Sequence, residues 1–217
     1  MTRLAVFDCD GTLVDGQAAI CETMEDAFAA AGLAAPSRQH IRRVVGLSLP
    51  QAMAILAPGA GAEGHDRLVG AYKDSFRARR IAGRLDEPLY EGIAELIVRL
   101  ADDGWQLGIA TGKSHRGLTA CLAGHGLADR FVTLQTADHH PSKPHPAMLE
   151  QALAEAGVGA EAAVMIGDTT FDMAMAGAAG VRAIGVAWGY HEADELLAAG
   201  AGSVAETIEE LEQEIRR

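Results

Sequence analysis

The chain has 217 residues, of which 49% are hydrophobic and 22% charged, and its formal net charge at pH 7 is −12. These values are typical of a soluble globular protein with one large domain, or with a main domain and a smaller insert. The negative charge argues against nonspecific binding to nucleic acid and against docking on an anionic membrane. We therefore expect neither as a partner, and an anionic substrate would need local cations or a metal.

The three cysteines lack the spacing of a zinc site or of a disulfide framework, and reduced thiols are the simplest interpretation. No apolar run approaches the ~20 residues that span a bilayer, and no secretion signal precedes the first apolar segment. These features predict a cytoplasmic protein, and they leave both a monomer and a homodimer open.

The first apolar segment, Leu4–Phe7, has the length of a strand with both faces buried. Two carboxylates, Asp8 and Asp10, follow it at i and i+2, and Gly11 allows the chain to bend after them. Alternate residues of a strand share a face, so the two carboxylates should lie close together. This is electrostatically unfavourable unless a cation lies between them or one is protonated. The simpler alternative is a strand end with two solvated aspartates.

The stretch from Gly16 to about Gly83 has helical periodicity and no convincing strand. Four helices are expected there, around residues 20–31 and 37–45, after Leu49-Pro50, and around 68–80. The stretch is predicted to be a small all-helical insert, residues 15–85. Its arginines either contact an acidic group of the substrate or lie on ordinary solvated helix faces, and the second interpretation is favoured for any single one.

After Pro88, strands alternate with helices, which indicates a parallel, doubly wound sheet. The expected strands cover residues 105–110, 131–135, 162–166 and 182–186. Helices are expected between them, and an exposed helix is expected over 205–217. The fold class is therefore α/β, with residues 1–14 and 86–217 as the core.

In an open parallel sheet, ligands bind outside the carboxyl ends of the strands. Polar residues follow four of the expected strands: Asp8 and Asp10, then Thr111 and Gly112, then Lys143, then Asp168 and Asp172. Each residue type has a task in phosphoryl transfer. A carboxylate can attack phosphorus, a protonated carboxyl can protonate the leaving oxygen, and oxygen ligands hold Mg²⁺. A hydroxyl and an ammonium can bind the remaining phosphoryl oxygens.

Each of these residues also has a simpler explanation when it is taken alone. Asp168 and Asp172 could be a helix cap and a solvated acid, and Thr111 could be an N-cap. Lys143 could be an ordinary surface lysine. Their joint arrival at one edge of the sheet argues against four separate explanations.

The segments that carry these residues resemble the four motifs of the haloacid dehalogenase superfamily, in order. They are Asp8-Cys9-Asp10-Gly11-Thr12, Thr111-Gly112, Lys143-Pro144, and Gly167-Asp168 with Asp172. The helical insert is similar to the superfamily's type-1 cap, and residues 167–173 and 186–190 resemble the phosphoglycolate-phosphatase-like branch. The resemblance implies a Rossmann-like core with strand order 5-4-1-2-3 in chain numbering.

The resemblance also implies a role for each matching residue. Asp8 would be the nucleophile and Asp10 the general acid and base. The phosphoryl group would be bound by Thr111, Gly112 and Lys143. Mg²⁺ would be held by Asp8, Asp168 and the backbone carbonyl of Asp10, and Asp172 would support the site by orienting Lys143 or a metal-bound water.

We therefore expect a Mg²⁺-dependent phosphatase that hydrolyses a small, phosphoglycolate-like phosphomonoester through an aspartyl-phosphate. A phosphomutase acting on a sugar phosphate, and a pyrophosphatase or nucleotidase, are alternatives in the same superfamily. Leu49 weakens the mutase alternative, because sugar-phosphate mutases tend to carry arginine there. A phosphate-binding or phospho-accepting regulatory protein is the non-enzyme alternative, although a phospho-accepting domain has no cap and no use for Asp10.

Overall fold

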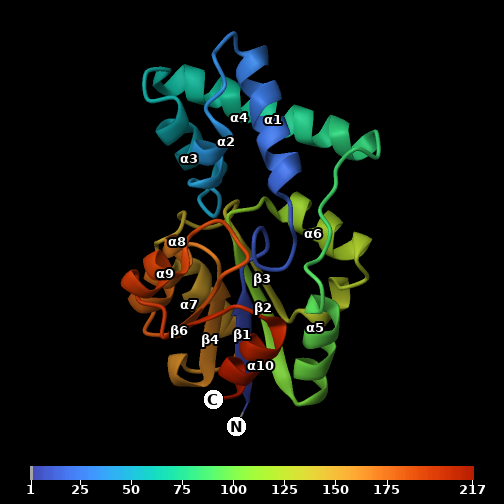
Figure 1. Cartoon of the computed structure of the whole chain (residues 1–217), viewed down its shortest axis with the longest axis vertical. Coiled ribbons are helices and arrows are strands. Elements are labelled where there is room, and N and C mark those ends of the chain that lie inside the picture. Colours follow the sequence, from blue (N-terminus) through green and yellow to red (C-terminus); the bar gives the residue numbers. More distant parts are fainter. Residues whose placement is uncertain (1) are drawn as a thin grey trace.

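The first strand, β1 (Arg3–Phe7), lies in the middle of a six-stranded parallel sheet in the computed structural model, which describes residues 2–217 (Figure 1). Its neighbours are β2 (Trp105–Thr111) and β4 (Ala163–Gly167). The order across the sheet is β3-β2-β1-β4-β5-β6. Read from the β6 edge, strands β1 to β5 have the expected order 5-4-1-2-3. The remaining strands are β3 (Thr133–Thr136), β5 (Arg182–Val186) and β6 (Ser203–Ala205).

Both faces of the sheet are covered by helices, because alternate residues of β1 are apolar on each side. Ala5 and Phe7 face a core formed with α5 (Ile93–Asp102), α6 (His115–Gly124) and α10 (Ile208–Arg216). Leu4 and Val6 face a second core formed with α7 (Ala147–Ala156), α8 (Thr170–Ala178) and α9 (Ala193–Ala198). The structure is thus the doubly wound α/β fold expected from the sequence.

The C-terminal region differs from the expected exposed helix over residues 205–217. The chain first forms the short edge strand β6 and then α10, whose Leu211 and Ile215 are fully buried. These two residues are four apart, so they lie on one helix face and pack against the sheet. The prediction was wrong because the acidic and basic residues of the outer face concealed a narrow apolar stripe.

A separate helical layer lies above the carboxyl ends of the strands (Figure 1). It consists of α1 (Gln17–Ala30), α2 (Arg38–Arg42), α3 (Leu49–Leu56) and α4 (Gly61–Ile81). All four helices were expected, and their buried residues form an apolar cluster of their own. The two connections to the sheet run side by side, because the Asp15 amide donates to the Pro88 carbonyl at 2.8 Å. None of the helices within residues 2–217 is long and apolar enough to cross a membrane.

Candidate active site

The end of β1 places Asp8 at the centre of the site. Its amide donates to the Ile166 carbonyl of β4, and its carboxylate accepts from the Cys9 amide at 2.7 Å. The side chain is buried, with 1% of the residue exposed. The turn after it needs Gly11, whose φ is +86° and where a Cβ would stand 2.2 Å from Oδ2 of Asp168. The chain therefore bends in a way that brings Asp168 close to Asp8.

Lys143 is fully buried between two of the acids, so the interpretation as a surface lysine is wrong. Its Nζ lies 2.6 Å from Oδ1 of Asp172 and 3.0 Å from Oδ2 of Asp8. Burial alone would lower the pKa of Lys143, but the charges of Asp172 and Asp8 outweigh burial and raise it. The ammonium is therefore held charged next to Asp8. Oδ2 of Asp8 still receives no hydrogen bond from residues 2–217, because the contact with Lys143 is ionic without hydrogen-bond geometry.

The loop after β4 holds Asp168 and Asp172 in different ways. Asp168 accepts hydrogen bonds from the Thr12 hydroxyl at 2.7 Å and from the Tyr190 amide at 3.0 Å. Thr169, not Asp168, is the N-cap of α8, and Asp172 completes the capping box by accepting from the Thr169 amide and hydroxyl. The helix-cap explanation thus accounts for one oxygen of Asp172, while the other oxygen binds Lys143.

Three buried carboxylates could together hold a metal ion. Asp8, Asp168 and Asp172 each offer an oxygen, and these oxygens lie within 4.8 Å of one another. Burial raises the pKa of Asp168 well above its usual range, and the negative charges of Asp172 and Asp8 raise it further. The Asp8 oxygen that receives no hydrogen bond and the excess of negative charge around Lys143 fit a hard divalent cation such as Mg²⁺. The Asp10 carboxylate is not part of this group.

Asp10 instead faces Lys113, for which no role was expected. The Lys113 Nζ lies 2.7 and 3.0 Å from the two oxygens of Asp10 and 2.7 Å from Oε1 of Glu87. Burial raises the pKa of Asp10, and Lys113 opposes this effect. The one sequence signal for Lys113 is its place directly after Thr111-Gly112, at the end of an expected strand.

Thr111 and Gly112 lie where β2 ends. Thr111 is the last residue of the strand and is buried, and Ser114 caps the following helix, so Thr111 is not its N-cap. A Cβ on Gly112 would stand 2.5 Å from the carbonyl oxygen of Leu47, in the loop between α2 and α3. The next residue of that loop, Ser48, donates from its amide to the Ser142 hydroxyl at 2.7 Å. The helical layer therefore touches the loops after β2 and β3.

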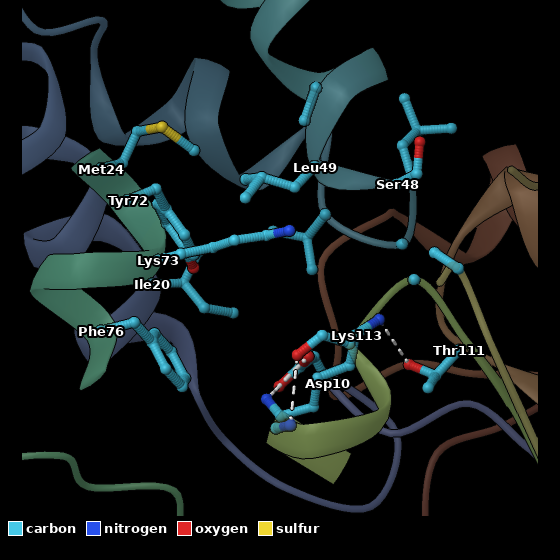
Figure 2. A pocket seen from close by; sticks show the side chains of 18 of the residues that line it. Asp10, Ile20, Met24, Ser48, Leu49, Tyr72, Lys73, Phe76, Thr111 and Lys113 are labelled. Atoms are coloured by element: carbon cyan, nitrogen blue, oxygen red, sulfur yellow. Dashed lines mark hydrogen bonds and ion pairs between the residues drawn. The ribbon is translucent and has the colours of Figure 1, made fainter. Parts of the chain in front are cut away.

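Between the helical layer and the strand ends lies a cavity of about 630 Å³. Asp8, Asp10, Thr111 and Gly112 are among the residues that line its sheet side, and side chains of α1, α3 and α4 line the other (Figure 2). Lys143, Asp168 and Asp172 lie beneath, against Asp8. The structure thus gathers the residues singled out in the sequence at one edge of the sheet, around one cavity.

The sequence profile of the haloacid dehalogenase-like hydrolases matches residues 5–186. The probable phosphatase IndB of Dickeya dadantii is 35% identical over 214 residues, which are 97% of this chain and 92% of that protein. A phosphoglycolate phosphatase of Rhodospirillum rubrum is 32% identical over 196 residues, 88% of this chain and 81% of that protein. A solved structure described as a "predicted phosphatase" from Clostridium acetobutylicum has a TM-score of 0.90 at 25% identity and covers 100% of this chain and 99% of its own. The chain belongs to the haloacid dehalogenase-like hydrolase family, in its phosphoglycolate-phosphatase-like branch.

Proposed function

We propose that the chain hydrolyses a small phosphomonoester with Asp8 as the nucleophile, in a Mg²⁺-dependent reaction. The observation that carries this proposal is the Asp8 carboxylate itself. It is buried beside the cavity, next to the Lys143 ammonium, and Oδ2 receives no hydrogen bond from the described residues. An oxygen in that position is available to bind a cation or to form a bond to phosphorus.

The first step would join a carboxylate oxygen of Asp8 to phosphorus and break the bond between phosphorus and the ester oxygen. Asp10 would give its proton to that oxygen, and burial raises the pKa of Asp10 against the opposing charge of Lys113, which is the direction this role requires. In the second step, water would attack the aspartyl-phosphate while Asp10 takes back a proton. Inorganic phosphate then leaves and Asp8 is restored.

Three further residues would bind the phosphoryl group: the Thr111 hydroxyl, the Gly112 amide and the Lys143 ammonium. Mg²⁺ would be held by Asp8, Asp168 and the backbone carbonyl of Asp10, with Asp172 fixing Lys143 through the 2.6 Å contact. When bound, the ion neutralises phosphoryl charge that would otherwise repel Asp8. The Asp8 oxygen without a hydrogen bond and the three converging carboxylates support this assignment.

We further propose that residues 15–85 act as a cap domain on a core made of residues 1–14 and 86–217. The apolar cluster within α1–α4 and the two adjacent connections to the sheet support this division. Closure of such a cap would exclude water from the site. Because the chain carries three buried free thiols, we place the reaction in the reducing cytoplasm.

The test is phosphate release from a panel of phosphoesters, measured with Mg²⁺ and with EDTA. Phosphoglycolate, named as the substrate of several relatives, is the reference ester. We expect many turnovers per chain, loss of turnover with EDTA, and no turnover by Asp8→Asn, whose circular dichroism should show an intact fold. Substantial turnover by Asp8→Asn would refute the mechanism, and a single phosphate per chain would indicate a phospho-accepting protein.

A further inference from the structure

The half of the cavity that the helical layer forms is mainly apolar. Ile20 and Met24 of α1 and Leu49 of α3 line it together with two aromatic residues of α4, Tyr72 and Phe76 (Figure 2). The two rings are stacked, with centroids 5.8 Å apart and planes inclined by 20°. The Arg80 guanidinium and the Lys113 ammonium already lie over the Phe76 ring, 5.3 and 5.4 Å from its centroid. Tyr72 is therefore the ring more open to a ring of a ligand.

Three cations of α4, Lys73, Arg77 and Arg80, also line the cavity, and Lys73 extends into its apolar region. Lys73 follows Tyr72 on α4, and its side chain extends across the cavity beneath Leu49 (Figure 2). Lys73 is exposed and forms no ion pair and no side-chain hydrogen bond within residues 2–217. Arg77, which also lines the cavity, is likewise without an ion pair there, whereas Arg79 and Arg80 of the same helix are paired with acids. An ammonium without a protein partner at the edge of an apolar wall is placed to bind an oxygen of the ligand.

The size of the cavity bears on the ligand that fits. A volume of about 630 Å³ lies within the range of sites that enclose drug-sized molecules. The leaving group of phosphoglycolate has only two carbons, one of which belongs to its carboxylate, so it would leave most of the apolar wall uncovered. A leaving group that carries a ring would bury this surface, and burial of apolar surface contributes to affinity.

We propose that the leaving group of the substrate carries a flat ring, which packs against Tyr72 and Phe76 while a ring oxygen substituent accepts from Lys73. Nucleoside monophosphates and substituted aryl-methyl phosphates share this chemistry. The inference rests on the proposed phosphatase function and narrows its substrate class. It makes Tyr72, Phe76 and Lys73 the residues that select the substrate.

The test measures binding to the Asp8→Asn variant by titration calorimetry with Mg²⁺ present, so that it does not depend on turnover. Uridine 5′-monophosphate supplies a ring with oxygen acceptors, benzyl phosphate a ring without them, and phosphoglycolate an acceptor without a ring. A substituted benzyl phosphate with a carboxylate on the ring separates the nucleoside from the aryl source. Tyr72→Leu and Lys73→Met are introduced into this background, and Arg67→Met, an exposed cation of α4 outside the cavity, is the matched control.

We expect the tighter of the two acceptor-bearing ring ligands to bind at least about tenfold more tightly than phosphoglycolate. Tyr72→Leu should weaken both that ligand and benzyl phosphate by about tenfold and leave phosphoglycolate within about twofold. Lys73→Met should weaken the acceptor-bearing ligand by about tenfold and leave benzyl phosphate unchanged. Arg67→Met should change none of these affinities.

Equal or tighter binding of phosphoglycolate, equal weakening of all ligands by Tyr72→Leu, or binding of none of them would overturn the inference. Phosphate release by the unmodified enzyme separates this failure from that of the proposed function. If phosphoglycolate is both the best ligand and the best substrate, the proposed phosphatase function is supported and the proposed ring-binding site is refuted. If the ring ligands bind as expected and no ester is hydrolysed, the ring-binding site is supported and the proposed phosphatase function is refuted.

Discussion

Lys113 binds both carboxylate oxygens of Asp10, at 2.7 and 3.0 Å, from a position 103 residues further along the chain. The same ammonium lies 2.7 Å from Glu87, and the side chains of Lys113 and Glu87 are only 7% and 8% exposed. Burial alone would lower the pKa of Lys113, but Asp10 and other nearby anionic groups hold it well above its usual range. Lys113 is therefore a fixed cation that decides where the Asp10 carboxyl points.

Glu87 extends this network to the helical layer. It lies in the segment that returns from α4 to the sheet, and its carboxylate forms an ion pair with Arg80 of α4 at 2.9 Å. A chain of contacts thus runs from Arg80 through Glu87 and Lys113 to Asp10. Through these contacts, a movement of α4 would shift the position of Asp10, the proposed acid and base.

Replacing Lys113 should therefore impair the proposed acid step more than phosphate binding. We expect Lys113→Met to lower kcat about 10–100-fold with an alkyl phosphate, because Asp10 loses the group that orients it. The loss should be much smaller with p-nitrophenyl phosphate, whose leaving group needs no proton, and Lys113→Arg should restore part of the activity. Asp10→Asn is the benchmark for this leaving-group pattern. An equal loss with both esters would show that Lys113 acts only on the fold.

Replacing Lys143 should affect stability as well as turnover. Lys143→Met would leave Asp8 and Asp172 buried without their cation. Removing one partner of a buried ion pair typically costs roughly 3–5 kcal/mol, so urea unfolding should show a loss of this order without metal. If Asp8 and Asp168 hold Mg²⁺, the ion should recover part of that loss, while turnover should stay very low. Unchanged stability without metal would contradict the arrangement.

Much of this site could be predicted because it depends on local sequence and on one topological rule. Short apolar strands such as Leu4–Phe7 are visible in the sequence, and a parallel sheet brings the residues after each strand to one edge. Asp8, Thr111 and Asp168 accordingly follow or end adjacent strands β1, β2 and β4. Position at the edge was therefore predictable from the chain alone.

The side-chain partners at that edge were not predictable in the same way. Nothing in the pattern around Lys113 distinguishes a lysine that reaches Asp10 from one that points to solvent, since the direction depends on Glu87 in another segment. The apolar face of α10 is a different case, because Ile208, Leu211 and Ile215 have helical spacing in the sequence and the expectation of an exposed helix overlooked it. Charge networks such as that of Lys113 depend on tertiary contacts rather than on local periodicity.

The acidic group formed by Asp8, Asp168 and Asp172 predicts stabilisation by metal, independently of activity. A ligand that binds the folded state raises its stability, by about 2.7 kcal/mol at a concentration 100 times its Kd. We expect Mg²⁺ to raise the thermal midpoint and EDTA to reverse the effect. In Asp168→Asn the rise should require a much higher Mg²⁺ concentration. Thr170→Ser, outside the acidic group, is the control, and the same Mg²⁺ response in Asp168→Asn would exclude Asp168 as a ligand.

A bidentate ion pair between Arg43 and Glu195 joins the helical layer to the core. Both terminal nitrogens of Arg43, which follows α2, contact the carboxylate of Glu195 in α9, at 2.5 and 2.8 Å. The hydrogen bonds from Arg43, together with one from the Glu192 amide, lower the pKa of Glu195 to about 2. The pair is exposed, so its contribution should be small and sensitive to salt.

The lowered pKa of Glu195 determines how the contribution of the Arg43–Glu195 pair to stability changes with pH. A carboxylate whose pKa is lower in the folded state stabilises that state above its ordinary pKa of 4.5, and the contribution disappears as the pH falls towards about 2. Arg43→Met should therefore lower the thermal midpoint at about pH 6 and have a smaller effect at about pH 3.5, where protonation of the unfolded chain has begun to remove the benefit. Comparing the variant with the parent at each pH cancels the titration of the buried acids, and Arg67→Met provides the baseline. If the difference in thermal midpoint between the parent and Arg43→Met grew as the pH falls, it would contradict the conclusion that Arg43 holds the Glu195 carboxylate in its ionised form.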